Sequence, residues 1–414
     1  GNGITVSNVA APTITSATYD YSTNVLTVTG TGFLSKSGAT NDVDLTKLTF
    51  TGEGGATYTL TNATGVEITS ATSFSVTLSG ADVTNVEALL NNNGTASVSA
   101  TTYNLSAAAS WNRGDSTGGS DTSNGITVSN YAAPTVTSAT YDASTGILTV
   151  TGTNLVSKSG AGNDVDVSKL TLAGEGGTYT LTSSSVEITN DTTFSVTLNA
   201  ADQMVVNGLL NKNGTVSSGA TTYNLAAAED WMAGSAASTV VADLTGNGIT
   251  VSNVQTPTIT SATYDSDTGV LTVTGTNLFS KVGASNDIDL TKLTFTGQGA
   301  GTYTLTNATG VEITSATSFT VTLTGADKTN VDALLNKIGT SANDATTYNL
   351  AAADDWLRAA DPAANIADAT NGVTVSIAPK ITSATYDAST GTLVVTGTNM
   401  QAQAARPTTL PPTS

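Results

Sequence analysis

The chain has 414 residues, which is long enough for several domains. Its formal net charge of -19 argues against nucleic-acid binding, which needs clustered lysine and arginine. The sequence contains neither cysteine nor histidine, which excludes disulfides, thiolate chemistry, histidine general bases and the usual zinc ligands. No apolar run is long enough to span a bilayer. We therefore expect a protein that is not an enzyme and has no membrane span in this segment.

An internal repeat dominates the sequence. The motif NGITVSN, with the variant NGVTVS in its last copy, starts at Asn2, Asn124, Asn247 and Asn371. A second motif, PTITSATYD with small variations, starts at Pro12, Pro134, Pro257 and Pro379. The spacing of about 122 residues is too long for a solenoid unit and is typical of a complete domain. The chain is therefore predicted to be a string of similar domains.

The two motifs set the predicted domain boundaries, because each repeat opens with PTITSATYD and closes with NGITVSN. The predicted domains are residues 12–132, 134–255 and 257–377. Residues 1–11 are then predicted to hold a strand from a preceding repeat. Residues 379–414 are predicted to be a truncated fourth repeat, with one hairpin and a proline-rich, disordered tail. We attribute the break to a frameshift near Met400, because codons for residues 405–410 can encode GATND followed by Val or Ile when read one base earlier, although the positions equivalent to Asp44, Leu45 and Thr46 are not recovered.

Most of each repeat is predicted to be β-strand, because it has a period-two pattern rich in Thr, Val, Ile and Tyr. In chain order, the second copy shows a hairpin over 139–152, two strands in KLTLAGEGGTYTLT and another pair in VEITNDTTFSVTL. TTYNL and NGITVSN bring the total to about seven or eight strands. The alternation and the turn spacing predict a β-sandwich.

One helix interrupts the strands of each repeat. In the first copy, ADVTNVEALLNNNG places Val83, Val86, Leu89 and Leu90 on one stripe, with Gly94 as the expected C-terminal stop. The third copy repeats this segment as ADKTNVDALLNKIG, and the second copy keeps its apolar positions. We therefore expect a short helix packed on the sandwich in every repeat.

The opening hairpin resembles repeats of known surface proteins. PTITSATYD followed by GVLTVTGTNL is similar to the start of immunoglobulin-like, TIG-type repeats. The whole unit, over about residues 1–399, resembles tandem repeats of giant bacterial exported proteins such as RTX-type adhesins. The resemblance implies an all-β-dominated chain of tandem Ig-like β-sandwich domains, an extracellular or bacterial cell-surface location, and calcium as a cofactor. The RTX nonapeptide GGxGxDxUx is absent, so that metal mechanism cannot be carried over.

The strongest candidate site is the acidic segment NDVDLTKL, which recurs as NDVDVSKL and NDIDLTKL. Two carboxylates at i and i+2, beside an amide, lie in a loop just before a strand and offer the oxygen ligands that calcium prefers. The alternative is that these residues cap the loop and stay solvated, or line a polar sheet edge. The predicted ligands are Asn41, Asp42, Asp44, Asn163, Asp164, Asp166, Asn286, Asp287 and Asp289.

Other polar and aromatic motifs are interpreted as structural. The acids of AAAEDW and AAADDW are expected to be solvated beside a packed tryptophan, because the first copy has AAASW instead. The tyrosine of each TTYNL is expected in the core or on a sheet face. The VEIT glutamates are expected to be exposed, because glycosidase catalysis would need a second carboxyl across a cleft. These glutamates are Glu67, Glu187 and Glu312.

Arg113, Gly114 and Asp115 form the tripeptide that integrins recognise in many extracellular proteins. The corresponding segments of copies two and three are MAGS and LRAA, so the tripeptide is not part of the repeat. We interpret it as a chance occurrence.

Together these observations favour a mechanical role. We predict a structural stalk of a bacterial secreted or cell-surface adhesin-like protein, with neighbouring repeats of the same chain as partners. The alternative is a module that binds a glycan or a host receptor through its interstrand loops. A stalk should show nearly the same loop chemistry in every repeat, whereas a binder should show an exposed aromatic or polar cluster in a concave site.

Overall fold

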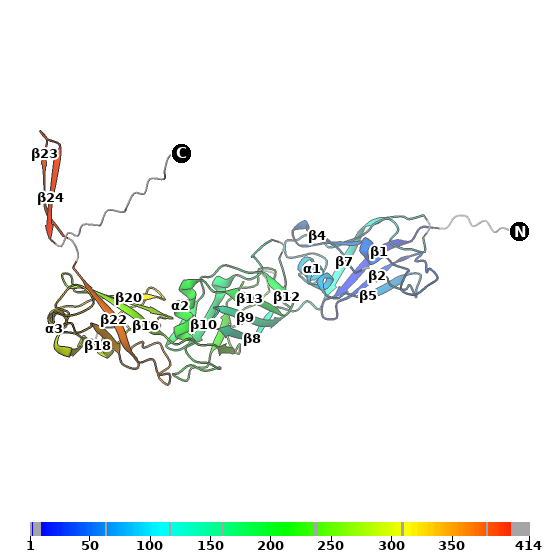
Figure 1. Cartoon of the computed structure of the whole chain (residues 1–414). Helices are drawn as coiled ribbons and strands as arrows, with labels where there is room; N and C mark the ends of the chain where they lie inside the picture. Colours follow the sequence, from blue (N-terminus) through cyan, green and yellow to red (C-terminus); the bar gives the residue numbers. More distant parts are fainter. Residues whose placement is uncertain are drawn as a thin grey trace. The chain divides into compact units, whose positions relative to one another are not determined.

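The computed structural model describes residues 2, 10–62, 64–115, 117–158, 160–235, 239–307, 310–377 and 380–398. Its contacts divide the chain into two compact units, Gly1–Val254 and Gln255–Ser414. The first unit holds two repeats and the second holds the third repeat and a hairpin (Figure 1). The predicted boundaries divide residues 12–377 into three domains. Independent folding of each repeat stays a prediction.

The first repeat is built from seven strands and one α-helix. Its elements are β1 (Thr13–Asp20), β2 (Val25–Thr31), β3 (Leu48–Thr51), β4 (Thr57–Thr59), β5 (Ser73–Thr77), α1 (Ala81–Leu89), β6 (Asn104–Ala107) and β7 (Asp121–Ser129), with 3-10 turns at Leu45–Lys47 (η1) and Glu53–Gly55 (η2). The strand order is β4-β3-β6-β7-β1-β2-β5. All pairs are antiparallel except β1 with β7, which are parallel.

Strand β7 belongs to two sheets. Its first half pairs with β6, as in Asn104 with Gly125, and its second half pairs with β1, as in Ala17 with Ile126. The first, second and fifth strands therefore form one layer, and the third, fourth and sixth form the other. This division matches the immunoglobulin sandwich, in which strands A, B and E oppose C, F and G. The predicted fold class, all-β-dominated tandem Ig-like sandwiches with one short helix each, is confirmed.

The third repeat reproduces this strand order, whereas the second forms two separate sheets, β11-β10-β14 and β12-β13-β9-β8-β15, with β12 as an additional strand. The second has β8 (Thr135–Asp142), β9 (Ile147–Thr153), η3 (Val167–Lys169), β10 (Leu170–Gly174), β11 (Gly177–Thr180), β12 (Ile188–Asn190), β13 (Thr193–Thr197), α2 (Ala200–Leu209), β14 (Asn224–Ala227) and β15 (Ile249–Ser252). The third has β16 (Thr258–Asp265), β17 (Val270–Thr276), η4 (Leu290–Lys292), β18 (Leu293–Thr296), η5 (Gln298–Ala300), β19 (Thr302–Thr304), β20 (Ser318–Thr322), α3 (Gly325–Leu334), β21 (Asn349–Ala352) and β22 (Asp368–Ser376). In each, the first and last strands again pair in parallel.

A β-bulge sets the phase of every opening strand. In β1 the register shifts between Ile14 and Ser16, and the burial pattern changes phase at the same point. The extra residue lets Ile14 point inward together with Ala17 and Tyr19, although strict alternation would send it outward. The same shift occurs at the same place in β8, β16 and β23, so it is a property of the repeat and not of one copy.

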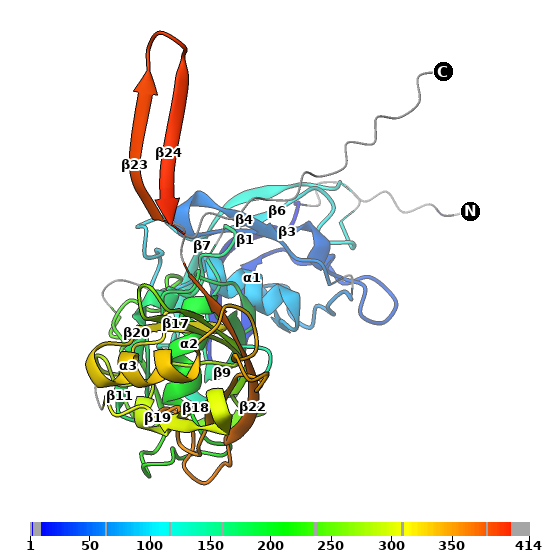
Figure 2. The same cartoon turned by 60° about the vertical axis from the view of Figure 1, so that its left-hand side comes forward.

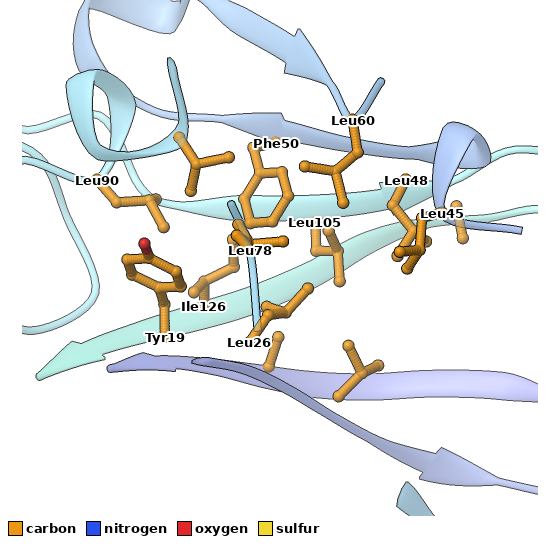
Figure 3. Packing of buried hydrophobic residues seen from close by; sticks show 14 of the residues in the cluster. Tyr19, Leu26, Leu45, Leu48, Phe50, Leu60, Leu78, Leu90, Leu105 and Ile126 are labelled. Carbon is orange, nitrogen blue, oxygen red and sulfur yellow. The ribbon is translucent and has the colours of Figure 1, made fainter. Parts of the chain in front are cut away.

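The core lies between the two layers. In the first repeat Tyr19, Leu26, Phe50, Leu105 and Ile126 are all fully buried and meet from both sheets (Figure 3). Burying one such aliphatic or aromatic side chain contributes about 1.5–3 kcal/mol. The tryptophan and the TTYNL tyrosine of every repeat are also buried, as predicted for the tyrosine.

Helix α1 closes one end of this core. Val83, Val86, Leu89 and Leu90 are buried, which confirms the predicted apolar stripe. The predicted stop at Gly94 is wrong, because the helix ends at Leu89 and Leu90 caps it. Gly94 instead has a φ of 99° and forms a β-bridge with Val128 of β7. This glycine therefore takes part in a sheet contact and does not end the helix. Among the described residues, no helix is long and apolar enough to cross a membrane.

The fourth copy consists of a hairpin, β23 (Lys380–Asp387) and β24 (Thr392–Thr398). Its register repeats that of the opening hairpin in the complete repeats. In the described part of the chain the two strands pair only with each other (Figure 2). The predicted strand of residues 1–11 and the predicted tail after residue 398 fall almost entirely outside the described residues.

Candidate functional site

The first aspartate of each NDxD segment is fully buried. In the first repeat, the Asp42 carboxylate accepts hydrogen bonds from the backbone N–H groups of Lys36 and Ile68, the latter over 2.6 Å. It therefore ties the loop before β3 to the segment before β5. Asp164 and Asp287 bind the corresponding amides in their own repeats.

A glutamate lies beside each of these aspartates. Glu67 accepts a hydrogen bond from the backbone N–H of Asn41 over 3.0 Å, so it closes the same loop from the other side. Glu187 and Glu312 make the same bond to Asn163 and Asn286. The VEIT glutamates were expected to be exposed: Glu187 is exposed, whereas Glu67 and Glu312 are half-buried.

In the second and third repeats the glutamate affects the aspartate beside it. Burial raises the pKa of Asp164 to about 6, and the hydrogen bond and negative charge of Glu187 act in the same direction. Burial raises the pKa of Asp287 to about 6, with Glu312 as its charged neighbour. Two carboxylates this close repel each other, so the pair favours either one shared proton or a cation.

The asparagine adds a third oxygen to this loop. Asn41 donates from Nδ2 to the carbonyl of Ser37 over 3.1 Å, while its buried Oδ1 faces no hydrogen-bond donor among the described residues. Asn286 has the same arrangement, with Nδ2 donating to Val282. Gly38 is required beneath it: its φ is 131°, and a Cβ there would lie 2.3 Å from Asn41 Nδ2. The sharp turn at Gly38 therefore holds the amide in place.

The second aspartate of each NDxD segment serves a different purpose. Asp44 caps η1 by accepting from the backbone N–H of Thr46 over 3.2 Å and from its hydroxyl over 2.7 Å. Its other oxygen pairs with Arg113 over 3.0 Å. Burial alone would raise the pKa of Asp44, but the bonds from Thr46 and Arg113 outweigh it and lower the value. Asp166 and Asp289 cap η3 and η4 in the same way.

The predicted metal ligands therefore separate into two groups. The structure brings Asn41 and Asp42 to Glu67 and directs Asp44 to Thr46 and Arg113. Within the described residues no group of three or more acidic side chains is placed to hold a metal ion. Calcium binding by Asn41, Asp42 and Asp44 and their counterparts stays a prediction, with Glu67 better placed than Asp44 as the third donor.

A third recurring aspartate was not identified as a site from the sequence. Asp82, in the first turn of α1, is buried and accepts from the Tyr58 hydroxyl, from the backbone and hydroxyl of Thr61, and from the backbone of Asn62, over 2.8–3.1 Å. Burial raises the pKa of Asp82, but these donors outweigh it and lower the value. We call the group formed by this aspartate and its donors the helix lock. Asp202 and Asp327 form the helix locks of the other repeats.

The acids beside the tryptophans bind backbone as well. Trp231 donates from Nε1 to the carbonyl of Val241 over 2.7 Å, and Glu229 accepts from the N–H groups of Val241 and Ala242. Asp354 makes the matching bond to Ile366 in the third repeat. The prediction of a packed tryptophan is confirmed, whereas the prediction of merely solvated acids is wrong for Glu229 and Asp354.

The Arg-Gly-Asp tripeptide is folded into a turn. The Arg113 guanidinium pairs with Asp44, the backbone N–H of Gly114 donates to Asn112 Oδ1, and the Asp115 carboxylate accepts from Thr117. In the third repeat Arg358 pairs with Asp289 over 3.5 Å, although Ala359 and Ala360 follow it in place of glycine and aspartate. The arginine therefore pairs with the capping aspartate in the first and third repeats, whether or not the tripeptide is present.

Comparison with known proteins gives no family. No protein-family model matches the chain, and no curated protein matches it. Among solved structures, a biofilm-associated protein BSP domain shares 13% identity over 91% of this chain and 68% of its own, with a TM-score of 0.15. A structure of the four N-terminal Ig domains of Dscam1 isoform 8.4 shares 9% identity over 89% and 79%, with a TM-score of 0.15. Likeness at this level identifies neither the family nor the function of this chain.

Proposed function

We propose that this chain is a stalk segment of a bacterial secreted or cell-surface protein, whose repeats extend a working region located elsewhere. The observation that carries the proposal is the repetition of internal contacts. The buried Asp42-type aspartate, the Asp44-type cap and the helix lock recur in all three repeats with the same backbone partners. Because these aspartates bind backbone groups of their own repeat, they stabilise that repeat. Differences between repeats are then expected at surface positions.

The distribution of aromatic side chains supports a stalk over a glycan or receptor binder. Loops that bind sugars or proteins commonly present exposed tyrosine or tryptophan. In the part of the chain that the structure describes, Tyr386 of the lone hairpin is the one aromatic ring in the exposed class. Most aromatic rings of the complete repeats lie in the core, and three of the half-buried tyrosines, Tyr58, Tyr179 and Tyr303, donate to the helix-lock aspartates.

The stalk proposal is tested by measuring length against repeat number. Chains ending after one, two and three repeats would be compared by small-angle X-ray scattering. A stalk predicts that the maximum dimension rises by a similar increment of about 30–45 Å for each added repeat of this size. A maximum dimension that stays constant as repeats are added would contradict the proposal, because the repeats would then fold back on one another.

We also propose that the loop of Asn41, Asp42 and Glu67 binds calcium, and that its counterparts do so in the other repeats. The buried Asn41 Oδ1 beside two carboxyl groups is the supporting observation. Calcium takes carboxylate and amide oxygens together, and it would neutralise the repulsion within the carboxyl pair. The chain itself supplies the sharp turn at Gly38 and the two amides that hold Asp42.

The calcium proposal is tested by thermal unfolding in 0 to about 10 mM calcium, a range that covers weak extracellular sites. We expect the melting temperature to rise with calcium, and we expect Glu67→Gln, Glu187→Gln and Glu312→Gln together to abolish the rise. The control is the triple variant Asp44→Asn, Asp166→Asn and Asp289→Asn, which should keep it. If the control variant also loses the calcium-dependent rise in melting temperature, the second aspartate is a ligand, as the sequence predicted. If the melting temperature of the parent chain does not rise with calcium, calcium binding is contradicted.

A further inference from the structure

The buried tyrosine of each opening strand bonds to a different kind of residue on the helix of its repeat. The three bonds run from the tyrosine hydroxyl: Tyr19 to Glu87 Oε1 over 3.3 Å, Tyr141 to Asn207 Oδ1 over 2.7 Å, and Tyr264 to Asp332 Oδ1 over 2.6 Å. The tyrosine is constant, whereas its acceptor is glutamate, asparagine or aspartate. This contact therefore differs in chemistry between repeats, unlike the helix locks, which keep an aspartate in all three.

In the second and third repeats, the acceptor carries no unpaired charge. Asp332 pairs with Lys328 Nζ over 2.6 Å, and the same Nζ donates to the carbonyl of Ser266 over 2.7 Å. The second repeat has Asn207 as a neutral acceptor and Gln203 at the position of Lys328. In these two repeats the position therefore holds either a carboxylate paired with a cation or an amide.

The first repeat has a carboxyl group at this position without a cation. Glu87 is 5% exposed, and Val83 occupies the position of Lys328. With the Asn24 amide oriented so that Nδ2 faces acceptors, it donates to Glu87 Oε1 and to the carbonyl of Tyr21, over 3.1 Å each. These acceptors are equivalent to the two that Lys328 binds in the third repeat. Asn24 therefore replaces the lysine in geometry but supplies no positive charge.

The surroundings of Glu87 disfavour its negative charge. Among the described residues, no lysine or arginine pairs with it. The titratable groups that interact with it are Tyr19 of β1, Tyr21 just after β1, and Asp191. Burial, with the charge of Asp191 in the same direction, raises the pKa of Glu87 to about 8, although the hydrogen bond from Tyr19 opposes the rise. A carboxylate is costly to bury without a cation, so this carboxyl group favours its protonated form.

We propose that Glu87 is a proton switch that controls how firmly helix α1 is held on β1 in the first repeat. In the neutral form, its carboxyl group accepts from Tyr19 without placing a charge in the core. As the pH rises, the carboxyl proton passes to water and leaves a carboxylate, which regains hydration when the helix loosens. This inference depends on neither the stalk proposal nor the calcium proposal.

The direction of the switch follows from the two protonation equilibria. The pKa of Glu87 in the folded state, about 8, lies above the ordinary value of 4.5, so the folded chain holds this proton more tightly than the unfolded chain. The stabilising contribution is therefore complete below pH 4.5 and is lost as the pH rises through about 8. The helices of the second and third repeats should not respond in this range, because their acceptors are neutral or paired.

Titration of the full chain in calcium-free buffer tests the protonation of Glu87. The chain is labelled at the glutamate Cδ carbons for NMR, and the signal that is missing from Glu87→Gln is the signal of Glu87. We expect this signal to titrate with a midpoint near 8. A midpoint near the ordinary 4.5 would overturn the switch, because the carboxyl group would then be ionised at neutral pH.

Hydrogen exchange of peptides that cover α1 tests the effect on the helix. The parent and Glu87→Gln are compared at the same pH, so that the intrinsic exchange rate cancels. The glutamine is neutral and keeps an oxygen acceptor for Tyr19. We expect the ratio of the parent rate to the variant rate to rise on the order of tenfold between pH 6.5 and pH 9, because one pH unit above the pKa is a factor of about ten. A ratio that is the same at both pH values would overturn the switch.

The matched control is Asp332→Asn in the third repeat. It replaces a carboxylate by an amide at the equivalent position, but this carboxylate is paired with Lys328, which keeps its charge at pH 9. The ratio of parent to variant exchange rates in α3 should therefore be the same at pH 6.5 and pH 9. A rise in α3 as large as the rise in α1 would contradict the proposal, because the missing cation would then not be the cause.

Discussion

The opening hairpin of the third repeat and the lone hairpin at the end of the chain have nearly the same sequence and different surroundings. Strands β16–β17 and β23–β24 share their register, their bulge and their turn. Tyr264 and Leu271 are 0% exposed, whereas the equivalent Tyr386 and Leu393 are 66% and 62% exposed. Local sequence therefore specifies the hairpin, but its burial depends on the facing sheet and the closing strand. An isolated two-stranded hairpin is marginal in water, so the lone copy should be the less stable by far.

The largest expected effect comes from removing the same side chain in both hairpins. Leu271→Ala should destabilise the third repeat by about 2–5 kcal/mol, because it removes a fully buried leucine from the core. Leu393→Ala should change stability by less than about 0.5 kcal/mol, because the side chain is exposed. Hydrogen exchange of the β17 and β24 amides in the full chain measures both. Equal loss of protection in the two variants would show that the lone hairpin is covered in solution.

The helix lock is present in the complete repeats and has no counterpart in the hairpin. Breaking it should therefore destabilise the third repeat and leave the hairpin unchanged. Asp327→Ala should cost about 2–4 kcal/mol, because the Tyr303 hydroxyl and the Thr306 and Asn307 amides lose their acceptor. Protection in β18 and β20 should fall while that in β23 stays unchanged. Asp327→Asn, which keeps one acceptor oxygen, is the matched control and should cost less.

This lock should also depend on pH in a defined direction. Burial opposes ionisation of Asp327, but its hydrogen bonds outweigh burial, so its pKa in the folded state lies below the unfolded value. Its contribution is therefore present above the unfolded value and is lost as the pH falls through the folded one. The difference in melting temperature between the parent and Asp327→Ala should shrink between pH 7 and pH 3. A constant difference would mean that the carboxylate charge is unimportant for the lock.

A smaller effect with the opposite sign is expected at the carboxyl pairs. The pKa of Asp164 is raised to about 6 by burial and by Glu187, so the folded state holds this proton more tightly than the unfolded chain. That contribution is complete at low pH and is lost as the pH rises through about 6. In calcium-free buffer, Glu187→Gln should raise the melting temperature at pH 7.5 by a few degrees and flatten its pH dependence. Asp267→Asn, at an exposed position, controls for net charge; an equal rise there would refute the pair.

The smallest effect is expected at the arginine pairs. Arg113→Ala should cost no more than about 1 kcal/mol, because its pair with Asp44 is partly exposed to solvent. The second repeat already has Ala233 at this position and retains the Asp166 cap. Ala233→Arg should therefore add a similarly small increment, measured by thermal unfolding at low salt. A loss above about 2 kcal/mol for Arg113→Ala would show that Asp44 depends on its partner.

Elements whose signal is local could be predicted from the sequence. The period-two segments gave the opening hairpins, and Val83, Val86 and Leu89 gave the face of α1, because both depend on spacing along the chain. The end of α1 was misplaced, because Gly94 serves a contact with Val128 of a distant strand. The bulge at Ile14 was also missed, because a register shift depends on the partner strand and not on the residues themselves.

The candidate site shows the same limit. Asp42 and Asp44 share a segment and therefore appeared to form one site, yet the structure sends them to different partners. Glu67, which accepts from the backbone N–H of Asn41 next to Asp42, lies in another motif, and only folding brings the two motifs together. The recurrence of aspartate at the start of each helix, and of Tyr-Thr-Leu-Thr before it, was a visible signal for the helix lock. Recurrence alone could not show which residues make contact.

The parallel pair of β1 and β7 has a mechanical consequence. A tensile load applied at the two ends of the first repeat pulls on the first residue of β1 and on the last residue of β7, in opposite directions. The bonds between the strands, from Ala17–Ile126 to Asp20–Ser129, then lie across the line of pull and must rupture together instead of unzipping one by one. The same parallel pairing closes the other complete repeats, so in each of them a tensile load would shear the first strand against the last.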